Sequence, residues 1–142
     1  MSPAAPTSVR VVLGDRDGRL LLLRRAGDDD HNPGLWEFPG GGIDAGESPR
    51  EAAARELHEE VGLDVVADQL ADWARYDRDE HGRSRRTAFF AHACRAEDCA
   101  PTLSDEHDAW RWAADAAEVG EVTPSTRWAA GRFTAPRSPP AA

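Results

Sequence analysis

Short apolar runs separated by turn residues alternate along the first forty positions of the chain. The segments VRVVLG and RLLLLRR flank the turn DRDG, which predicts two strands joined in a hairpin-like manner. LWEFP follows as a short strand closed by Pro39, and GGGIDAGE is expected to be a glycine-rich loop. Strands are also predicted in ADWARYDR, RRTAFFAHAC and AWRWA.

The strongest helical signal begins at Ser48. This residue is placed to cap a helix, Pro49 suits the first turn, and Glu51 completes a capping box with Ser48. Gly62 is placed to end the helix, so about thirteen residues are predicted to be helical. A second helix is predicted in PSTRWAAGRF. Strands and helices in this order, without regular βαβ alternation, predict an α+β domain around a mixed sheet.

The 142 residues are enough for one domain and too few for two independent cores. We expect this domain to span residues 7–133. Residues 1–6 and 134–142 are rich in proline, alanine and serine and, apart from Met1, contain no large apolar residue, so they are predicted to be flexible tails.

Charge and hydropathy exclude several classes of protein. Acidic residues outnumber basic ones by 26 to 17, and the net charge of −9 repels a nucleic-acid backbone, so no nucleic-acid polymer is expected as a partner. No apolar run is long enough to cross a bilayer, and the first residues lack the features of a signal peptide. We therefore expect no membrane partner and a cytoplasmic location. Cys94 and Cys99 match no zinc-binding spacing and are interpreted as free thiols.

Three glutamates gather on one side of the first predicted helix. On a helical wheel, Glu56, Glu59 and Glu60 fall within about a third of the circumference, beside the face that packs. Like charges at this spacing repel by a few tenths of a kcal/mol per pair, and Arg55 alone does not neutralise three carboxylates. A hard divalent cation such as Mg²⁺ would offset the charge, and a solvated acidic face is the alternative.

The same helix and the loop before it match a known pattern. Residues 41–63 fit Gly, five residues, Glu, seven residues, Arg, Glu, an aliphatic residue, any residue, Glu, Glu, any residue, Gly and an aliphatic residue. This segment resembles the Nudix box, and the flanking segments WEFPGG and SDEHDAWRW resemble the same family. The fixed positions are filled by Gly41, Glu47, Arg55, Glu56, Leu57, Glu59, Glu60, Gly62 and Leu63.

The resemblance implies a Nudix fold, in which a mixed sheet is sandwiched between helices and the box forms a loop, a helix and a loop. It also implies an enzyme that hydrolyses a nucleoside diphosphate linked to another group. The implied cofactor is Mg²⁺, with Mn²⁺ as a substitute, held by Glu56, Glu59, Glu60 and the carbonyl of Gly41. In the alternative assignment, Glu56 is the base for the attacking water.

Two further acidic residues are assigned roles by the resemblance. Glu47 is the expected partner of Arg55, which would orient the catalytic glutamates. Glu106 stands where many relatives place one more metal-binding or base glutamate, although its neighbours in DEHDAW could each be mistaken for it.

The resemblance also suggests substrate contacts. Arg25, at the end of the second strand, would bind phosphate oxygens with its bidentate guanidinium. Glu37 and Phe38 would lie beside the base. Relatives that act on oxidised guanine nucleotides read the purine with an asparagine where this chain has Thr126 or Ser125, and this departure speaks against that preference.

Elimination of other signatures leaves a (deoxy)nucleoside triphosphate as the leading substrate, hydrolysed to the monophosphate and pyrophosphate. ADP-ribose and dinucleoside polyphosphates are alternative substrates. A catalytically inactive nucleotide-binding module is the alternative from another class, but Arg55 and the helix glutamates are intact and favour an enzyme. The expected partner is thus a small nucleotide, and no oligomeric state is predicted.

Overall fold

The computed structural model describes residues 5–28, 32–80, 83–94 and 100–132. Within these residues, the strands are β1 (Ser8–Gly14), β2 (Leu20–Arg25), β3 (Trp36–Glu37), β4 (Gly40–Gly42), β5 (Ala71–Glu80), β6 (Arg83–Ala93) and β7 (His107–Ala113). The α-helices are α1 (Pro49–Val61) and α2 (Pro124–Ala130), and two short 3₁₀ helices are η1 (Ala67–Gln69) and η3 (Ala116–Glu118).

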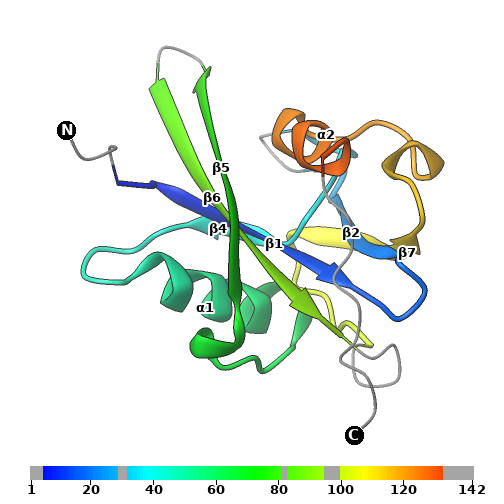
Figure 1. Ribbon diagram of the computed structural model, residues 1–142. Coiled ribbons are helices and arrows are strands. Elements are labelled where there is room, and N and C mark those ends of the chain that lie inside the picture. The colour runs from blue at the N-terminus through cyan, green and yellow to red at the C-terminus, as the bar shows by residue number, and fades with distance from the viewer. Residues whose placement is uncertain (1–4, 29–31, 81–82, 95–99, 133–142) are drawn as a thin grey trace, which may run out of the picture.

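Strand β1 lies at the centre of the sheet. It pairs in parallel with β6, where Ser8 lies opposite Thr87, and antiparallel with β4, where Val9 lies opposite Gly41. The path through the sheet runs β3-β2-β1-β6-β5, with β4 attached to β1 and β7 attached to β2 (Figure 1). The sheet is therefore mixed, as predicted.

The predicted hairpin-like turn is present, but β1 and β2 diverge directly after it. Among the described residues, only Gly14 and Leu20 pair between these two strands. The turn itself is closed by Asp15, whose carboxylate accepts hydrogen bonds from the amides of Asp17 and Arg19. Beyond the turn β2 pairs with β7 and β3 instead, so the two strands lead to different sides of the molecule.

The expected glycine-rich loop is partly a strand, because β4 pairs with β1. A Cβ atom at Gly40 would overlap the carbonyl oxygen of Val9, so only glycine allows the two backbones to approach so closely. Residues 43–48 form the loop that leads into α1.

Helix α1 begins and ends as predicted. The Ser48 hydroxyl accepts a hydrogen bond from the Glu51 amide, and the Glu51 carboxylate accepts one from the Ser48 amide. Gly62 ends the helix in the left-handed conformation, with φ of 71°. The helix therefore carries its glutamates at fixed positions beside β4.

Two apolar layers lie on opposite faces of the sheet. Consecutive residues of β1, Val11 and Val12, point into different layers, as expected for a strand. One layer packs α1 through Leu57, and the other packs α2 through Ala129 (Figure 1). A mixed sheet sandwiched between helices is the α+β architecture that the Nudix resemblance implies, and this prediction is confirmed.

Three predictions concern the ends and the chemistry of the chain. Of the predicted tails, only residues 5 and 6 are described, and the remainder lies outside the described residues. In the part of the chain that the structure describes, no helix combines the length and hydropathy that a membrane span needs. The interpretation of free thiols is wrong for Cys94, which is disulfide-bonded.

Candidate active site

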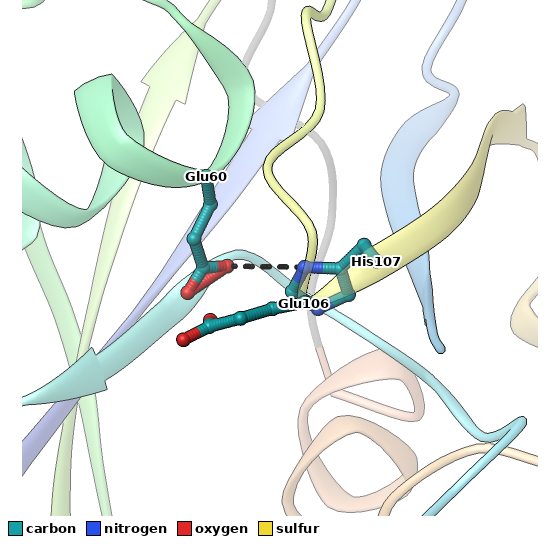
Figure 2. Close-up of side chains that lie close together, drawn as sticks. All are labelled: Glu60, Glu106 and His107. Carbon is teal, nitrogen blue, oxygen red and sulfur yellow. Dashed lines mark ion pairs between the residues drawn. The ribbon is translucent and has the colours of Figure 1, made fainter. Parts of the chain in front are cut away.

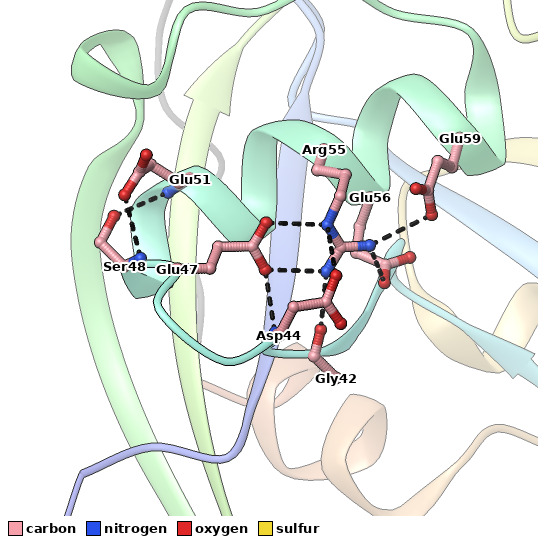
Figure 3. Close-up of polar contacts among 8 residues, drawn as sticks. All are labelled: Gly42, Asp44, Glu47, Ser48, Glu51, Arg55, Glu56 and Glu59. Atoms are coloured by element: carbon pink, nitrogen blue, oxygen red, sulfur yellow. Dashed lines mark hydrogen bonds and ion pairs between the residues drawn. The ribbon is translucent and has the colours of Figure 1, made fainter.

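Arg55 is the centre of a group of ion pairs that ties the loop before α1 to the helix (Figure 3). Its Nε donates to Glu47 Oε2 at 2.8 Å and its Nη2 donates to Glu47 Oε1 at 2.9 Å. Nη2 also donates to the carbonyl of Gly42 at 3.0 Å, while Nη1 donates to Glu56 at 3.1 Å and to Glu59 at 3.2 Å. The expected pair between Arg55 and Glu47 is present, and we call these five residues the Arg55 clamp.

Each of the paired groups Arg55 and Glu47 favours the ionised form of the other. The hydrogen bonds from Arg55 are the largest reason why the pKa of Glu47 is lowered to about 2, and the Asp44 amide adds to the effect. Glu47 in turn raises the pKa of Arg55 above its ordinary value. Both groups therefore stay ionised at neutral pH, and the two hydrogen bonds between them are charge-assisted.

The three helix glutamates lie in different surroundings. Glu60 is 2% exposed and Glu56 is 9% exposed, whereas the Glu59 side chain is 53% exposed. The helical wheel places the three glutamates beside the face that packs, but Glu56 and Glu60 are themselves buried, because the acidic side of α1 packs against the glycine strand β4. The Glu56 carboxylate lies directly on Gly41, where a Cβ atom would overlap it. The structure thus brings Gly41 to the glutamates.

Burial changes the proton affinity of the two inner glutamates. It raises the pKa of Glu60 well above the ordinary value, and the charges of Glu37 and Glu56 add to this, with Arg10 as a partial offset. Burial also raises the pKa of Glu56, against the opposing effects of Glu60 and Arg55. Both carboxyls therefore hold a proton more readily than an ordinary glutamate, and a bound cation could take the place of that proton.

Glu106 and His107, at the start of β7, complete this arrangement (Figure 2). One ligand atom each from Glu60, Glu106 and His107 all lie within 4.8 Å of one another. Glu106 is exposed, whereas His107 and Glu60 are buried. We call Glu56, Glu60, Glu106 and His107 the Glu60 cluster.

A second buried carboxylate, Glu37, holds the other side of the imidazole. Its Oε2 lies 2.9 Å from His107 Nε2 and 2.9 Å from Arg25 Nη1, and its Oε1 lies 3.3 Å from Arg10 Nη1. Burial alone would raise the pKa of Glu37, but Arg10, the hydrogen bond with His107 and Arg25 together lower it to about 2. Glu37 is therefore an ionised acceptor at neutral pH, held by residues of β1, β2 and β7.

The substrate contacts suggested by the resemblance fall in different places. Phe38 is fully buried in the core layer beneath α2, and Glu37 is 1% exposed. Thr126 is also fully buried, and its hydroxyl accepts hydrogen bonds from the Phe38 amide and the Thr123 hydroxyl. These placements do not support direct base contacts by the three side chains. Arg25 is 18% exposed and binds Glu37, so it lies at the edge of the site.

A pocket of about 500 Å³ opens on the α2 side of the sheet, and the sequence pattern did not single it out. The Trp128 ring lies 5.0 Å from the Tyr76 ring, and the Arg132 guanidinium stacks over Trp128 at 4.9 Å. Within the described residues, Arg78 and Arg127 form no ion pair. Arginines beside aromatic rings suit a ligand that carries both a base and phosphates. The pocket is lined by Tyr76, Arg78, Val122, Pro124, Arg127, Trp128 and Arg132.

Strand β3 contacts both the pocket and the Glu60 cluster. The backbone of Trp36 exchanges hydrogen bonds with the segment before α2, its amide donating to Glu121 and its carbonyl accepting from Thr123, each at 2.9 Å. The next residue, Glu37, contacts His107. One short strand therefore connects the basic and aromatic pocket with the acidic site.

Comparison with known proteins agrees with this architecture. The family model for the NUDIX domain matches residues 4–132. The chain is 33% identical over 135 residues to an RNA pyrophosphohydrolase of Rhodospirillum rubrum, covering 79% of each protein. It is 37% identical over 99 residues to the CTP pyrophosphohydrolase of Escherichia coli K12, covering 69% of this chain and 68% of that protein.

The fold is also similar to solved structures. The crystal structure of the MutT protein from Methanosarcina mazei Go1 matches with a TM-score of 0.71 and 27% identity, over 89% of this chain and 91% of that one. With the Nudix box residues gathered at one site and the family model matching nearly the whole chain, the protein belongs to the Nudix hydrolase family and is MutT-like.

Proposed function

We propose that this enzyme removes pyrophosphate from a nucleoside triphosphate in a Mg²⁺-dependent hydrolysis that leaves the nucleoside monophosphate. The observation that carries the proposal is the Glu60 cluster, in which the buried Glu60 lies beside Glu106 and His107. Two relatives named as pyrophosphohydrolases support the release of pyrophosphate.

The residues of the cluster fit a divalent cation. Two of its carboxylates have raised pKa values because burial and mutual repulsion are only partly offset by arginine. His107 Nδ1 is buried and makes no hydrogen bond within the described part of the chain. Glu56, Glu60 and Glu106 would hold the cation, and the Nudix resemblance adds Glu59 and the Gly41 carbonyl as candidate ligands. A bound Mg²⁺ would supply Lewis acidity for the phosphate oxygens.

Individual side chains have distinct proposed roles. Glu56 is the candidate base, because its carboxylate is fixed by Arg55 and could accept a proton from the attacking water. Arg55 is a positioning residue that sets the direction of Glu56 and Glu59. Arg25, at the exposed edge of the Glu37 network, is the candidate phosphate contact.

The basic pocket beside α2 is the proposed site for the rest of the nucleotide. Trp128 and Tyr76 offer ring faces for a base, and Arg78 and Arg127 offer guanidinium groups without an acidic partner among the described residues. Such a site would accept several bases, because every base has a face that can stack on an aromatic ring.

A panel of substrates with Mg²⁺ tests the proposal. It contains the ribo- and deoxynucleoside triphosphates, ADP-ribose and a dinucleoside tetraphosphate, and the products are separated by anion-exchange chromatography. We expect a monophosphate and pyrophosphate from at least one triphosphate, and no product with Glu60→Gln. Binding of nucleotides without any turnover would instead favour a nucleotide-binding module.

A second candidate substrate is the 5′-triphosphate end of an RNA. It is favoured by the 33% identity to an RNA pyrophosphohydrolase, and the net charge of −9 opposes it. Adding a 5′-triphosphorylated oligonucleotide to the panel distinguishes the two. If RNA is the substrate, kcat/KM for the oligonucleotide should exceed that for the free triphosphates at equal ionic strength.

A further inference from the structure

His107 presents a buried nitrogen that has no hydrogen-bond partner. The side chain is 1% exposed, and within the described residues its Nδ1 accepts or donates no hydrogen bond. Glu60 Oε2 lies 3.7 Å from it, which is ion-pair distance for a protonated imidazole but too long for a hydrogen bond. A buried nitrogen is costly to leave unpaired, so its position calls for a hydrogen-bond partner or ligand that the described residues do not supply.

The opposite nitrogen of the ring is fixed by Glu37. Nε2 lies 2.9 Å from Glu37 Oε2, and the same carboxylate is bound by Arg10 and Arg25. A carboxylate held by two guanidinium groups accepts hydrogen bonds, so Nε2 carries the proton that it donates. In the neutral ring, Nδ1 is then left with an available lone pair.

That lone pair lies on the side of the ring where the carboxylates gather. Ligand atoms of Glu60, Glu106 and His107 all lie within 4.8 Å of one another, and Figure 2 shows the three side chains converging from α1 and β7. A carboxylate behind a histidine, with the other nitrogen turned to a metal, is a recurring arrangement in metalloproteins.

We propose that His107 Nδ1 is a metal ligand and that Glu60, Glu106 and His107 form a mixed oxygen and nitrogen site, with Glu37 as the residue that orients the imidazole. This inference rests on the proposed function only in that the same cation would serve hydrolysis. Both imidazole and carboxylate ligands bind Mn²⁺, Co²⁺ and Zn²⁺ more tightly than Mg²⁺, and this preference is larger for imidazole. The site should therefore bind these ions more tightly than a site made of oxygen alone.

Electron spin-echo spectroscopy of bound Mn²⁺ tests the nitrogen directly, without substrate or turnover. The full chain is loaded with Mn²⁺ alone, and coupling to a directly bound ¹⁴N nucleus is expected. Growth with ¹⁵N-labelled histidine should change that signal to the ¹⁵N pattern. In His107→Gln the coupling should disappear and the Kd for Mn²⁺ should rise at least about tenfold.

Two controls keep the test decisive. His58, exposed on α1 and bound to Asp64, is the matched control, so His58→Gln should keep the nitrogen coupling. If His107→Gln does not fold, a variant with the other four histidines replaced by glutamine leaves His107 alone and should keep the coupling.

The alternative is a doubly protonated His107 that merely bridges Glu37 and Glu60. Bound Mn²⁺ without nitrogen coupling, coupling that survives in His107→Gln, or no Mn²⁺ binding at millimolar concentration would each overturn the proposal. Hydrolysis of a triphosphate with no nitrogen coupling would overturn the ligand assignment and leave the proposed function standing. Nitrogen coupling without hydrolysis of any nucleotide would do the reverse.

Discussion

The Arg55 clamp and the Glu60 cluster share helix α1 and Glu56 but differ in how their charges are balanced. In the clamp, one guanidinium binds Glu47 through two hydrogen bonds and lowers the pKa of that carboxylate. In the cluster, the pKa of Glu60 is raised and a buried nitrogen of His107 makes no hydrogen bond among the described residues. The charges of the clamp are paired within the folded protein, whereas our proposal assigns a cation to the cluster.

Among the experiments that test this comparison, removal of divalent cations should have the largest effect on hydrolysis. We expect EDTA to abolish hydrolysis, because the cluster alone does not neutralise the phosphate oxygens. Added Mg²⁺ or Mn²⁺ should raise the melting temperature, since binding to the folded protein stabilises it by about 2.7 kcal/mol at a concentration of 100 Kd. Full turnover in EDTA would contradict the assignment of the cluster.

Neutralising one carboxylate of the cluster should have the second-largest effect on hydrolysis. Glu60→Gln and Glu56→Gln should each lower kcat by about a thousandfold or more. In EDTA their melting temperatures should equal or exceed that of the wild type, because each change relieves the crowding of two buried carboxyl groups. Steady-state kinetics and thermal melts check both expectations, and a large loss of stability with unchanged kcat would refute them.

The same isosteric change in the clamp should have a smaller and different effect. Glu47→Gln removes the ionised partner of Arg55, so the guanidinium should orient Glu56 and Glu59 less well and kcat should fall by about 10- to 100-fold. In contrast to Glu60→Gln, the melting temperature should fall. A rise in melting temperature would mean that the clamp is no better balanced than the cluster.

The stability of the metal-free protein should depend on pH, and the shifted pKa values of Glu60 and Glu37 give the direction of the change. The pKa of Glu60 is raised above the ordinary 4.5, so the folded protein keeps a proton that the unfolded chain has lost. Stability should therefore fall as pH rises from 4.5 through the folded-state pKa. Glu37, with a pKa of about 2, contributes stability above 4.5 that is lost as pH falls toward 2. Between about pH 5 and 8, melts in EDTA should show a shallower decline for Glu60→Gln than for the wild type, and equal slopes would contradict this.

The smallest effect is expected at Glu51, on the same helix but outside both groups. Its carboxylate completes the capping box, and glutamine can accept the same hydrogen bond from the Ser48 amide. Glu51→Gln should leave kcat unchanged and shift the melting temperature by no more than about 2 °C. A loss of kcat like that of Glu60→Gln would show that any charge change on α1 impairs activity.

Local signals predicted much of the fold and part of the site. The capping box at Ser48 and the glycine at Gly62 define α1 because they act within a few residues, and the box pattern identified Arg55 and its glutamates. Burial of Glu37 was not predictable, because its partners come from three other strands that meet only in the folded sheet. His107 gave no signal beyond its place next to Glu106, since a lone histidine has no periodic pattern.

The position of β1 at the centre of the sheet has a consequence for the order in which the protein is made. The hydroxyls of Ser8 and Thr87 lie 2.9 Å apart, although 79 residues separate them in the chain. A ribosome adds about 5 to 20 residues per second, so β1 waits several seconds for its parallel neighbour. By then the Arg55 clamp has long been synthesised, while His107 is still to come. A polypeptide stalled before β7 would thus carry the clamp and its helix without a complete Glu60 cluster.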